Sequence, residues 1–316
     1  MLRTLLITAK PRYCFSRLIF NRRYLSLSTA SMTSTAGIDE TLSEFFAQYS
    51  LNDSSDEVTL SAIVQVLADQ VQQASKVEDY VWDANHRILK LAGETNPGPQ
   101  DALIEFLVKL RQTPVTKAGS DEPLVCEGGR VWTDLPMFGW AARDLWNFDI
   151  YNKDTKLEEL NTFRCQNAFL AQLTALSNLD DPKDPFDYSL YALWTLRTAL
   201  EDTPPKDASA GRVTGAVKLA EIWIHYAGDA LKKLSAKNLS FEGNMGNPGD
   251  KYADRDWKGF SEERWAVWME ELKKAKKDDD DAAKKDDDDA AKKDDDDAAK
   301  KDDDDAAKKD DDDATK

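Results

Sequence analysis

Residues 60–71 read LSAIVQVLADQV, and the spacing of their apolar side chains decides the fold class. These side chains recur at intervals of three and four positions, which is the repeat of one face of an α-helix. The same interval continues through Tyr80, Trp82, Ile88 and Leu91. The apolar positions of the quoted stretch are Leu60, Ile63, Val64, Val66, Leu67 and Val71. The pattern predicts a long helical region that opens the folded part of the chain.

Helical patterns also fill most of the remaining body, and loops rich in Pro and Gly separate them. Thr41 and Glu44 form a capping box, Asp184-Pro185 predicts a helix start, and Ser261 caps a last helix. Residues 242–249 read EGNMGNPG and predict a flexible connection. Further helices are expected over residues 102–110, 157–176, 188–200 and 213–234, and after Asp134-Leu-Pro. Strands are marginal, so we expect an all-α fold, a single irregular bundle of about seven or eight helices.

The two ends differ from this body in composition. Residues 1–31 hold six basic and no acidic residues, which predicts a mitochondrial presequence cut after Arg22-Arg23-Tyr24. Translation from Met32 would instead give a cytoplasmic protein. Residues 276–316 repeat a Lys-Lys-Asp-Asp-Asp-Asp-Ala-Ala unit, which predicts a disordered acidic tail or, as an alternative, low-affinity cation binding. We therefore expect a leader over 1–31, a partly ordered segment over 32–57, a helical domain over 58–275 and a tail over 276–316.

The net charge of −17 argues against binding to nucleic acid, because phosphates require Lys and Arg. No apolar run approaches the ~20 residues of a membrane span. The three cysteines fit no pair spacing, so we expect a reducing compartment. The protein or small-molecule partner and the oligomeric state stay open.

Few residues in the chain point to chemistry. The only histidines are His86, three residues after Asp83, and His225, four residues after Glu221, and neither pair fits a di-metal bundle. We therefore expect no metal and, because no nucleotide-binding motif is present, no cofactor. Cys126 lies in a loop without a neighbouring base, so a catalytic thiol is disfavoured.

Five charged residues are candidates for a pocket or for a structural polar network: Asp134, Arg143, Arg197, Glu201 and Arg264. Arg197 and Glu201 are four residues apart on a helix, which favours a structural ion pair. As an alternative, Arg143, Arg197 and Arg264 could form an anion site if their helices converge.

Three parts of the body together resemble a known family. They are residues 132–147, which begin WTDLPMFG; residues 169–174 with 191–201; and residues 223–228 with 257–268. In this order they are similar to the fungal all-helical domain of unknown function numbered thirty-six thirty-two, over roughly Val58 to Glu271. The resemblance implies no reaction and no catalytic residues. Independently of it, five tryptophans are predicted to anchor the core: Trp132, Trp140, Trp146, Trp265 and Trp268.

The sequence favours a non-enzymatic module that binds a partner or ligand. The alternatives are an enzyme with a site around Asp134, Arg143, Arg197 and Glu201, and cation binding by the tail.

Overall fold

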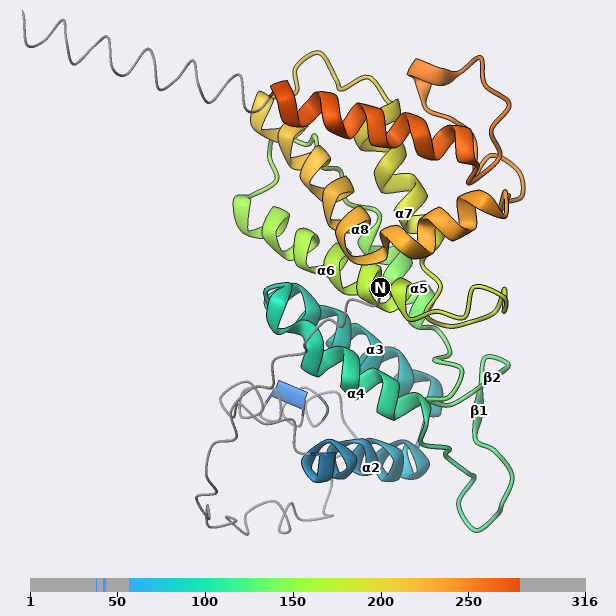
Figure 1. Cartoon of the computed structure of the whole chain (residues 1–316). Coiled ribbons are helices and arrows are strands. Elements are labelled where there is room, and N and C mark those ends of the chain that lie inside the picture. The colour runs from blue at the N-terminus through green and yellow to red at the C-terminus, as the bar shows by residue number, and fades with distance from the viewer. Residues whose placement is uncertain (1–37, 39–41, 44–56, 279–316) are drawn as a thin grey trace, which may run out of the picture. The chain divides into compact units, whose positions relative to one another are not determined.

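The computed structural model describes Ile38, Leu42, Ser43 and residues 57–278, and these residues form an all-α fold (Figure 1). Within them lie eight α-helices and one small two-stranded sheet. The predicted all-α class is therefore confirmed. The leader, the repeat tail beyond residue 278, and Thr41 and Glu44 of the expected capping box lie outside the described residues.

The longest connections between helices lie between α4 and α5 and between α8 and the last helix. They are α2 (Glu57–Gln73), α3 (Val77–Glu94), α4 (Asp101–Arg111), α5 (Phe138–Leu145), α6 (Leu157–Ala175), α7 (Ser189–Leu196), α8 (Ala210–Ala236) and a last helix over residues 262–278. Single turns of 3₁₀ helix lie at Gly98–Gln100 and Asp250–Tyr252, and a π-helical turn over Arg197–Glu201 continues α7. Strands β1 (Val125–Cys126) and β2 (Gly129–Arg130) pair antiparallel.

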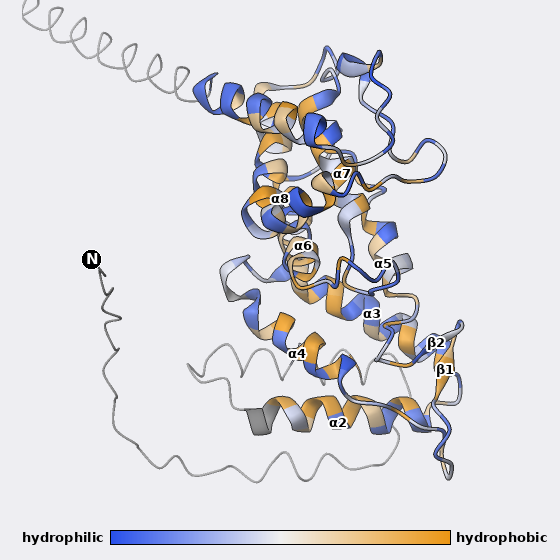
Figure 2. Cartoon of the chain, turned by 45° about the vertical axis from the view of Figure 1, so that its right-hand side comes forward, coloured by the Kyte–Doolittle hydropathy of each residue, from blue (hydrophilic) through white to orange (hydrophobic). Residues whose placement is uncertain are grey.

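The apolar pattern of the first two helices is interrupted where the sequence predicted continuity. α2 ends at Gln73 and α3 begins at Val77, and the hydroxyl group of Tyr80 donates a 2.7 Å hydrogen bond back to Gln70 across the break. Figure 2 shows that hydrophobic residues alternate with hydrophilic ones along α2, α3 and α4, as expected of helices that bury one face.

Helix α6 forms the centre of the domain. It packs against α3 on one side and α8 on the other (Figure 1). Its buried Asn167 accepts a 2.8 Å hydrogen bond from the indole N–H of Trp223 on α8 and a 3.4 Å bond from Thr195 on α7. These bonds satisfy polar groups that would otherwise be costly to bury, and they join three helices.

Of the two helix starts predicted at Ser261 and at Asp184-Pro185, the structure confirms only the first. Ser261 accepts a hydrogen bond from the backbone N–H of Arg264, so its predicted role as N-cap is confirmed. Asp184 instead accepts from the N–H of Phe186 in a turn, and α7 begins only at Ser189, whose N–H donates to Asp187. An aspartate therefore accepts a backbone hydrogen bond in each of the two turns before α7. Asp184-Pro185 lies in the first of these turns and does not start the helix.

The tryptophans predicted as core anchors do not all lie in the core. Trp132 and Trp268 have no exposed surface, and Trp146 and Trp265 are half-buried against the core. Trp140 is 56% exposed, so the prediction for this residue is wrong. The reason is the short helix α5, which buries Phe138, Ala141 and Ala142 on one face and directs Trp140 away from that face.

Among the described residues, no helix is both long enough and apolar enough to cross a bilayer.

Candidate functional site

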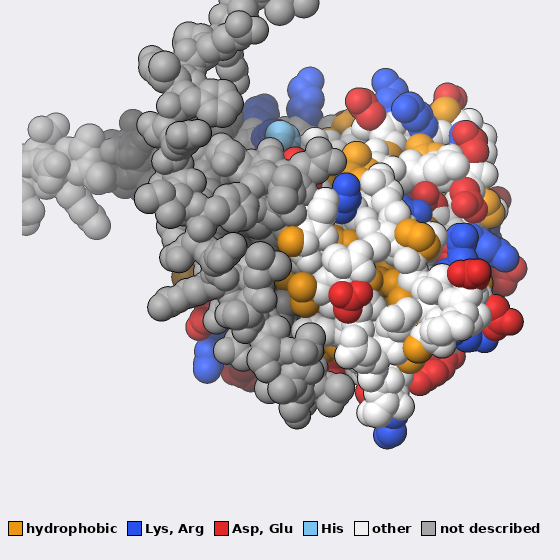
Figure 3. Space-filling model, turned by 90° about the horizontal axis from the view of Figure 1, so that it is seen from below, with side chains coloured by type: hydrophobic (Ala, Val, Ile, Leu, Met, Phe, Trp, Pro, Cys, Tyr) orange, Lys and Arg blue, Asp and Glu red, His pale blue; other side chains and the backbone are white. Residues whose placement is uncertain are grey.

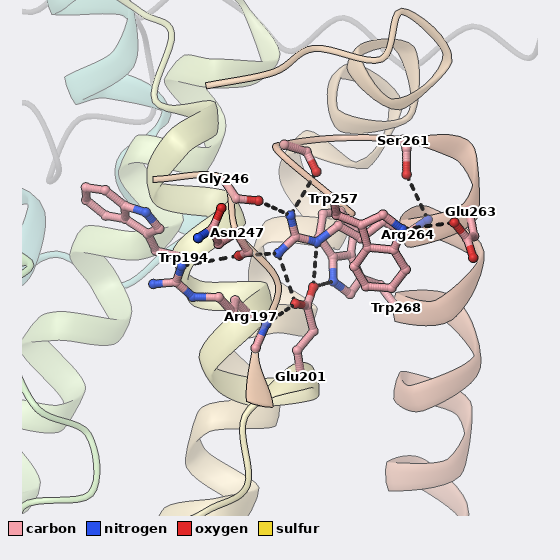
Figure 4. A network of polar contacts seen from close by, with 12 residues as sticks. Trp194, Arg197, Glu201, Gly246, Asn247, Trp257, Ser261, Glu263, Arg264 and Trp268 are labelled. Carbon is pink, nitrogen blue, oxygen red and sulfur yellow. Dashed lines mark hydrogen bonds and ion pairs between the residues drawn. The ribbon is translucent and has the colours of Figure 1, made fainter. Parts of the chain in front are cut away.

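A buried ion pair ties the last helix to the π-helical turn (Figure 4). The Nε and Nη2 atoms of Arg264 donate to the two carboxylate oxygens of Glu201 at 2.7 and 2.9 Å. Both side chains have no exposed surface. Such a bidentate pair is the strongest geometry available to arginine and a carboxylate, and here it fixes the last helix against the end of α7.

The remaining donors of Arg264 are all used by backbone carbonyl groups. Nη1 donates to the carbonyl oxygens of Gly246 and Gly259 at 2.7 and 2.9 Å, and Nη2 also donates to that of Asn247 at 3.1 Å. An arginine has five N–H donors, so this guanidinium group has none left for a ligand.

The carboxylate of Glu201 is equally occupied. Besides Arg264, it accepts a 2.6 Å hydrogen bond from the indole N–H of Trp268 and a 2.8 Å bond from the backbone N–H of Gly249. Four donors therefore surround its two oxygens. A carboxylate held in this way stabilises the fold and is not placed to accept a proton from a substrate.

The connection over residues 242–249 is held in place where the sequence predicted flexibility, because its carbonyl and N–H groups bind Arg264 and Glu201. Two of its glycines are required by close packing. A Cβ atom at Gly246 would lie 1.9 Å from the carbonyl oxygen of Lys258, and one at Gly249 would lie 2.6 Å from the backbone carbon of Glu201. The glycines of this segment indicate a tightly packed loop, and the predicted flexible connection is wrong.

Arg197 does not form the ion pair with Glu201 that the sequence favoured, because Arg264 occupies both oxygens of that carboxylate. A 2.9 Å bond from the N–H of Asp202 to the carbonyl of Arg197 closes the π-helical turn. Figure 4 shows the guanidinium group of Arg197 on the side of Trp194, away from Glu201. Its Nη1 atom donates a long 3.4 Å bond to the carbonyl of Asn247, the same oxygen that Arg264 uses.

Beside Arg197 lies a cavity of about 230 Å³ with aromatic walls. Phe148 and Phe163 stack with their ring centroids 4.4 Å apart, and Trp146 meets Phe163 edge-on at 5.4 Å. The residues that line the cavity include Trp146, Phe148, Phe163, Trp194, Thr195 and Arg197. They come from the end of α5 and the connection that follows it, and from α6, α7 and the π-helical turn.

The other two predicted site residues lie outside this cavity lining. Arg143 is exposed on α5, with its guanidinium carbon 5.8 Å from the ring centroid of Trp194. Asp134 pairs with Arg130 at 2.7 Å, and this hydrogen-bonded pair lowers the pKa of the aspartate. Glu201, Arg264 and Arg197 thus lie in one network, Arg143 adjoins it through Trp194, and Asp134 belongs to a separate surface pair.

The other candidate chemical groups are occupied or isolated. Burial raises the pKa of the Cys126 thiol to about 11, which disfavours the reactive thiolate. His86 packs against Trp82, and its Nδ1 lies 3.0 Å from the carbonyl oxygen of Trp82, whereas His225 is exposed. Across the described residues, no group of three or more His, Cys, Asp and Glu side chains is arranged to hold a metal ion.

The segment that begins WTDLPMFG has an unusual backbone. Trp132, Leu135 and Met137 all have left-handed φ angles, of 63°, 44° and 62°. Such angles are rare for large side chains and persist only where surrounding contacts enforce them. Here the buried amide group of Asn85 on α3 donates a 2.9 Å bond to the carbonyl of Pro136, and Trp132 is fully buried. The segment therefore depends on α3 for its shape.

Neither the curated proteins nor the solved structures gave a match to the chain. A family model described as "Protein of unknown function (DUF3632)" matches residues 86–272. The match begins within α3, later than the resemblance from Val58, and ends in the last helix. It therefore includes the strained WTDLPMFG segment, the cavity and the buried ion pair. The chain belongs to the DUF3632 family of proteins of unknown function.

Proposed function

We propose that this domain is a ligand-binding module and that the aromatic cavity beside Arg197 is its binding site. The observation that carries the proposal is the composition of the cavity wall. Four aromatic side chains line a half-open space of about 230 Å³, and Thr195, Arg197 and Thr198 are the polar residues of the lining. Clefts that combine aromatic walls with a few polar groups are typical of sites for small organic molecules.

The volume of the cavity indicates the size of the ligand group that enters it. A cavity of about 150 Å³ inside a protein is known to accept benzene. The cavity beside Arg197 is half open to solvent, and its space of about 230 Å³ suits a ligand group of one ring with a short substituent. Aromatic walls favour a flat aromatic ligand, because contacts between ring edges and ring faces add binding energy to that gained by burying apolar surface.

An enzymatic site around the predicted charged residues has less support. Both oxygens of Glu201 are occupied and Asp134 is paired with Arg130, so neither is positioned as a general base at the cavity. One face of the domain is mixed in character. Figure 3 shows apolar side chains scattered between polar and charged ones over the described part of the face seen from below.

Calorimetric titration of the full chain with one-ring compounds such as benzamide and phenol tests the proposal. Wild-type protein is expected to bind them, and Ala216→Leu, which fills the cavity from α8, is expected to abolish the heat of binding. Ala236→Leu is the matched control, because it makes the same change at an exposed position of the same helix. Thr198→Leu narrows the cavity from the π-helical turn if Ala216→Leu does not fold. Equal binding by wild type and both cavity variants would reject the site.

We also propose that residues 1–31 direct the protein into mitochondria. This segment contains six basic residues and no acidic residue, a composition typical of a mitochondrial presequence. The test is N-terminal sequencing of the protein from cells. A start after Tyr24 supports import, and a start at or just after Met32 contradicts it.

A further inference from the structure

The two arginines near the cavity, Arg264 and Arg197, differ in how many of their N–H groups are already hydrogen-bonded within the protein. Arg264 is fully occupied by Glu201 and three carbonyl groups, so it contributes little free charge. Arg197 is the one charged residue among the described residues that line the cavity. In the described part of the chain it forms no ion pair, and its single hydrogen bond is the 3.4 Å contact with Asn247. Most of its N–H groups therefore remain available.

We propose that the cavity selects a small carboxylic acid with a single ring, whose carboxylate binds the guanidinium group of Arg197 while its ring lies among Trp146, Phe163 and Trp194. This inference rests on the proposed function and names the class of ligand. The planar guanidinium group presents paired donors that match the two oxygens of a carboxylate. The half-buried position of Arg197 strengthens such a contact relative to one in open water.

The neighbouring groups favour an anion that enters from the cavity. Trp194 is fixed by a 3.0 Å bond from its indole N–H to the carbonyl of Met245, so the wall beside Arg197 is preformed. Asp202 also interacts electrostatically with Arg197, but its carboxylate accepts a bond from the N–H of Asp250 and does not line the cavity. A ligand carboxylate supplies the hydrogen-bonded acid group that no described side chain gives to Arg197.

A comparison of acids with their neutral amides tests this inference. Benzoate and phenylacetate are titrated into the full-length protein at pH 7, alongside benzamide and phenylacetamide, which have nearly the same shape without the charge. Wild type is expected to bind each acid at least about tenfold more tightly than its amide, because hydrogen bonds between charged groups are the stronger ones. Arg197→Met is expected to remove this preference while keeping the affinity for the amides, which shows that the cavity is intact. Arg255→Met is the matched control, because it removes an exposed arginine that does not line the cavity.

The outcomes separate the two proposals. Equal affinities for acid and amide in wild type would overturn the carboxylate inference and leave the proposed function standing. An acid preference that persists in Arg197→Met would overturn the assignment of Arg197. Failure of all four compounds to bind would contradict the proposed function as well.

Discussion

Arg264 donates two parallel hydrogen bonds to Glu201, at 2.7 and 2.9 Å, and neither side chain has any surface exposed to solvent. The two residues are 63 positions apart in the chain and lie on the last helix and on the turn that ends α7. The same turn begins with Arg197, which lines the cavity. The buried pair therefore fixes one wall of the candidate binding site.

Loss of one partner of this pair is expected to be costly. Arg264→Met leaves the carboxylate of Glu201 buried without its counter-charge, which should lower the free energy of unfolding by about 3–5 kcal/mol. Replacing both residues, as Glu201→Leu with Arg264→Met, should cost less than the single change. Urea unfolding measures the loss of stability in both variants. Arg255→Met breaks an exposed pair with Glu263 and should cost at most about 1 kcal/mol. A cost for Arg264→Met no larger than this control would contradict a stabilising role for the buried pair.

Two tryptophans that differ in solvent exposure provide a test of the described core. Trp268→Ala removes a fully buried ring and a donor to Glu201, and should cost about 3–5 kcal/mol. Trp140→Ala changes a side chain that is 56% exposed and should change stability by about 0.5 kcal/mol or less. Thermal or urea unfolding distinguishes the two variants, and comparable losses would contradict the exposed position of Trp140.

Cys126 should react slowly in the folded protein. Burial raises the pKa of its thiol from 9.0 to about 11, which lowers the thiolate fraction at pH 8 roughly a hundredfold. In a variant with Cys14→Ser and Cys165→Ala, a disulfide reagent should modify Cys126 at least about a hundredfold more slowly in buffer than in urea. Rapid modification in buffer would show an accessible thiolate and would revive the catalytic-thiol hypothesis.

Asp202 should make stability depend on pH. Burial raises the pKa of its carboxyl group above the ordinary value of 3.8, against the opposing effect of Arg197. The folded state then binds the proton more tightly than the unfolded chain, so this contribution to stability is present at acid pH and is lost as pH rises through the raised pKa. Asp202→Asn lacks the titrating group, so its stability relative to wild type should increase between pH 3 and pH 7 in urea titrations. A difference that stays constant across this range would contradict the shift.

The sequence predicted local features of the fold well and distant ones poorly. The repeat of apolar residues every three or four positions and the cap at Ser261 depend on neighbours within a few residues, and the structure confirms both helices and cap. The Glu201–Arg264 pair depends on how distant helices meet, so the sequence supplied both residues as candidates without their partnership. The π-helical turn and the fixed loop over residues 242–249 likewise arise from contacts made only in the folded domain. Trp140 was misassigned because residue type alone does not show which face of a short helix is buried.

A crystal structure of the protein with 4-bromobenzoate tests the central claim most directly, because the anomalous signal of bromine locates the ligand without ambiguity. We expect one bromine peak inside the cavity between Trp146, Phe163 and Trp194, with the carboxylate oxygens about 3 Å from the nitrogens of Arg197. An empty cavity at saturating ligand, or a bromine peak elsewhere on the domain, would contradict it.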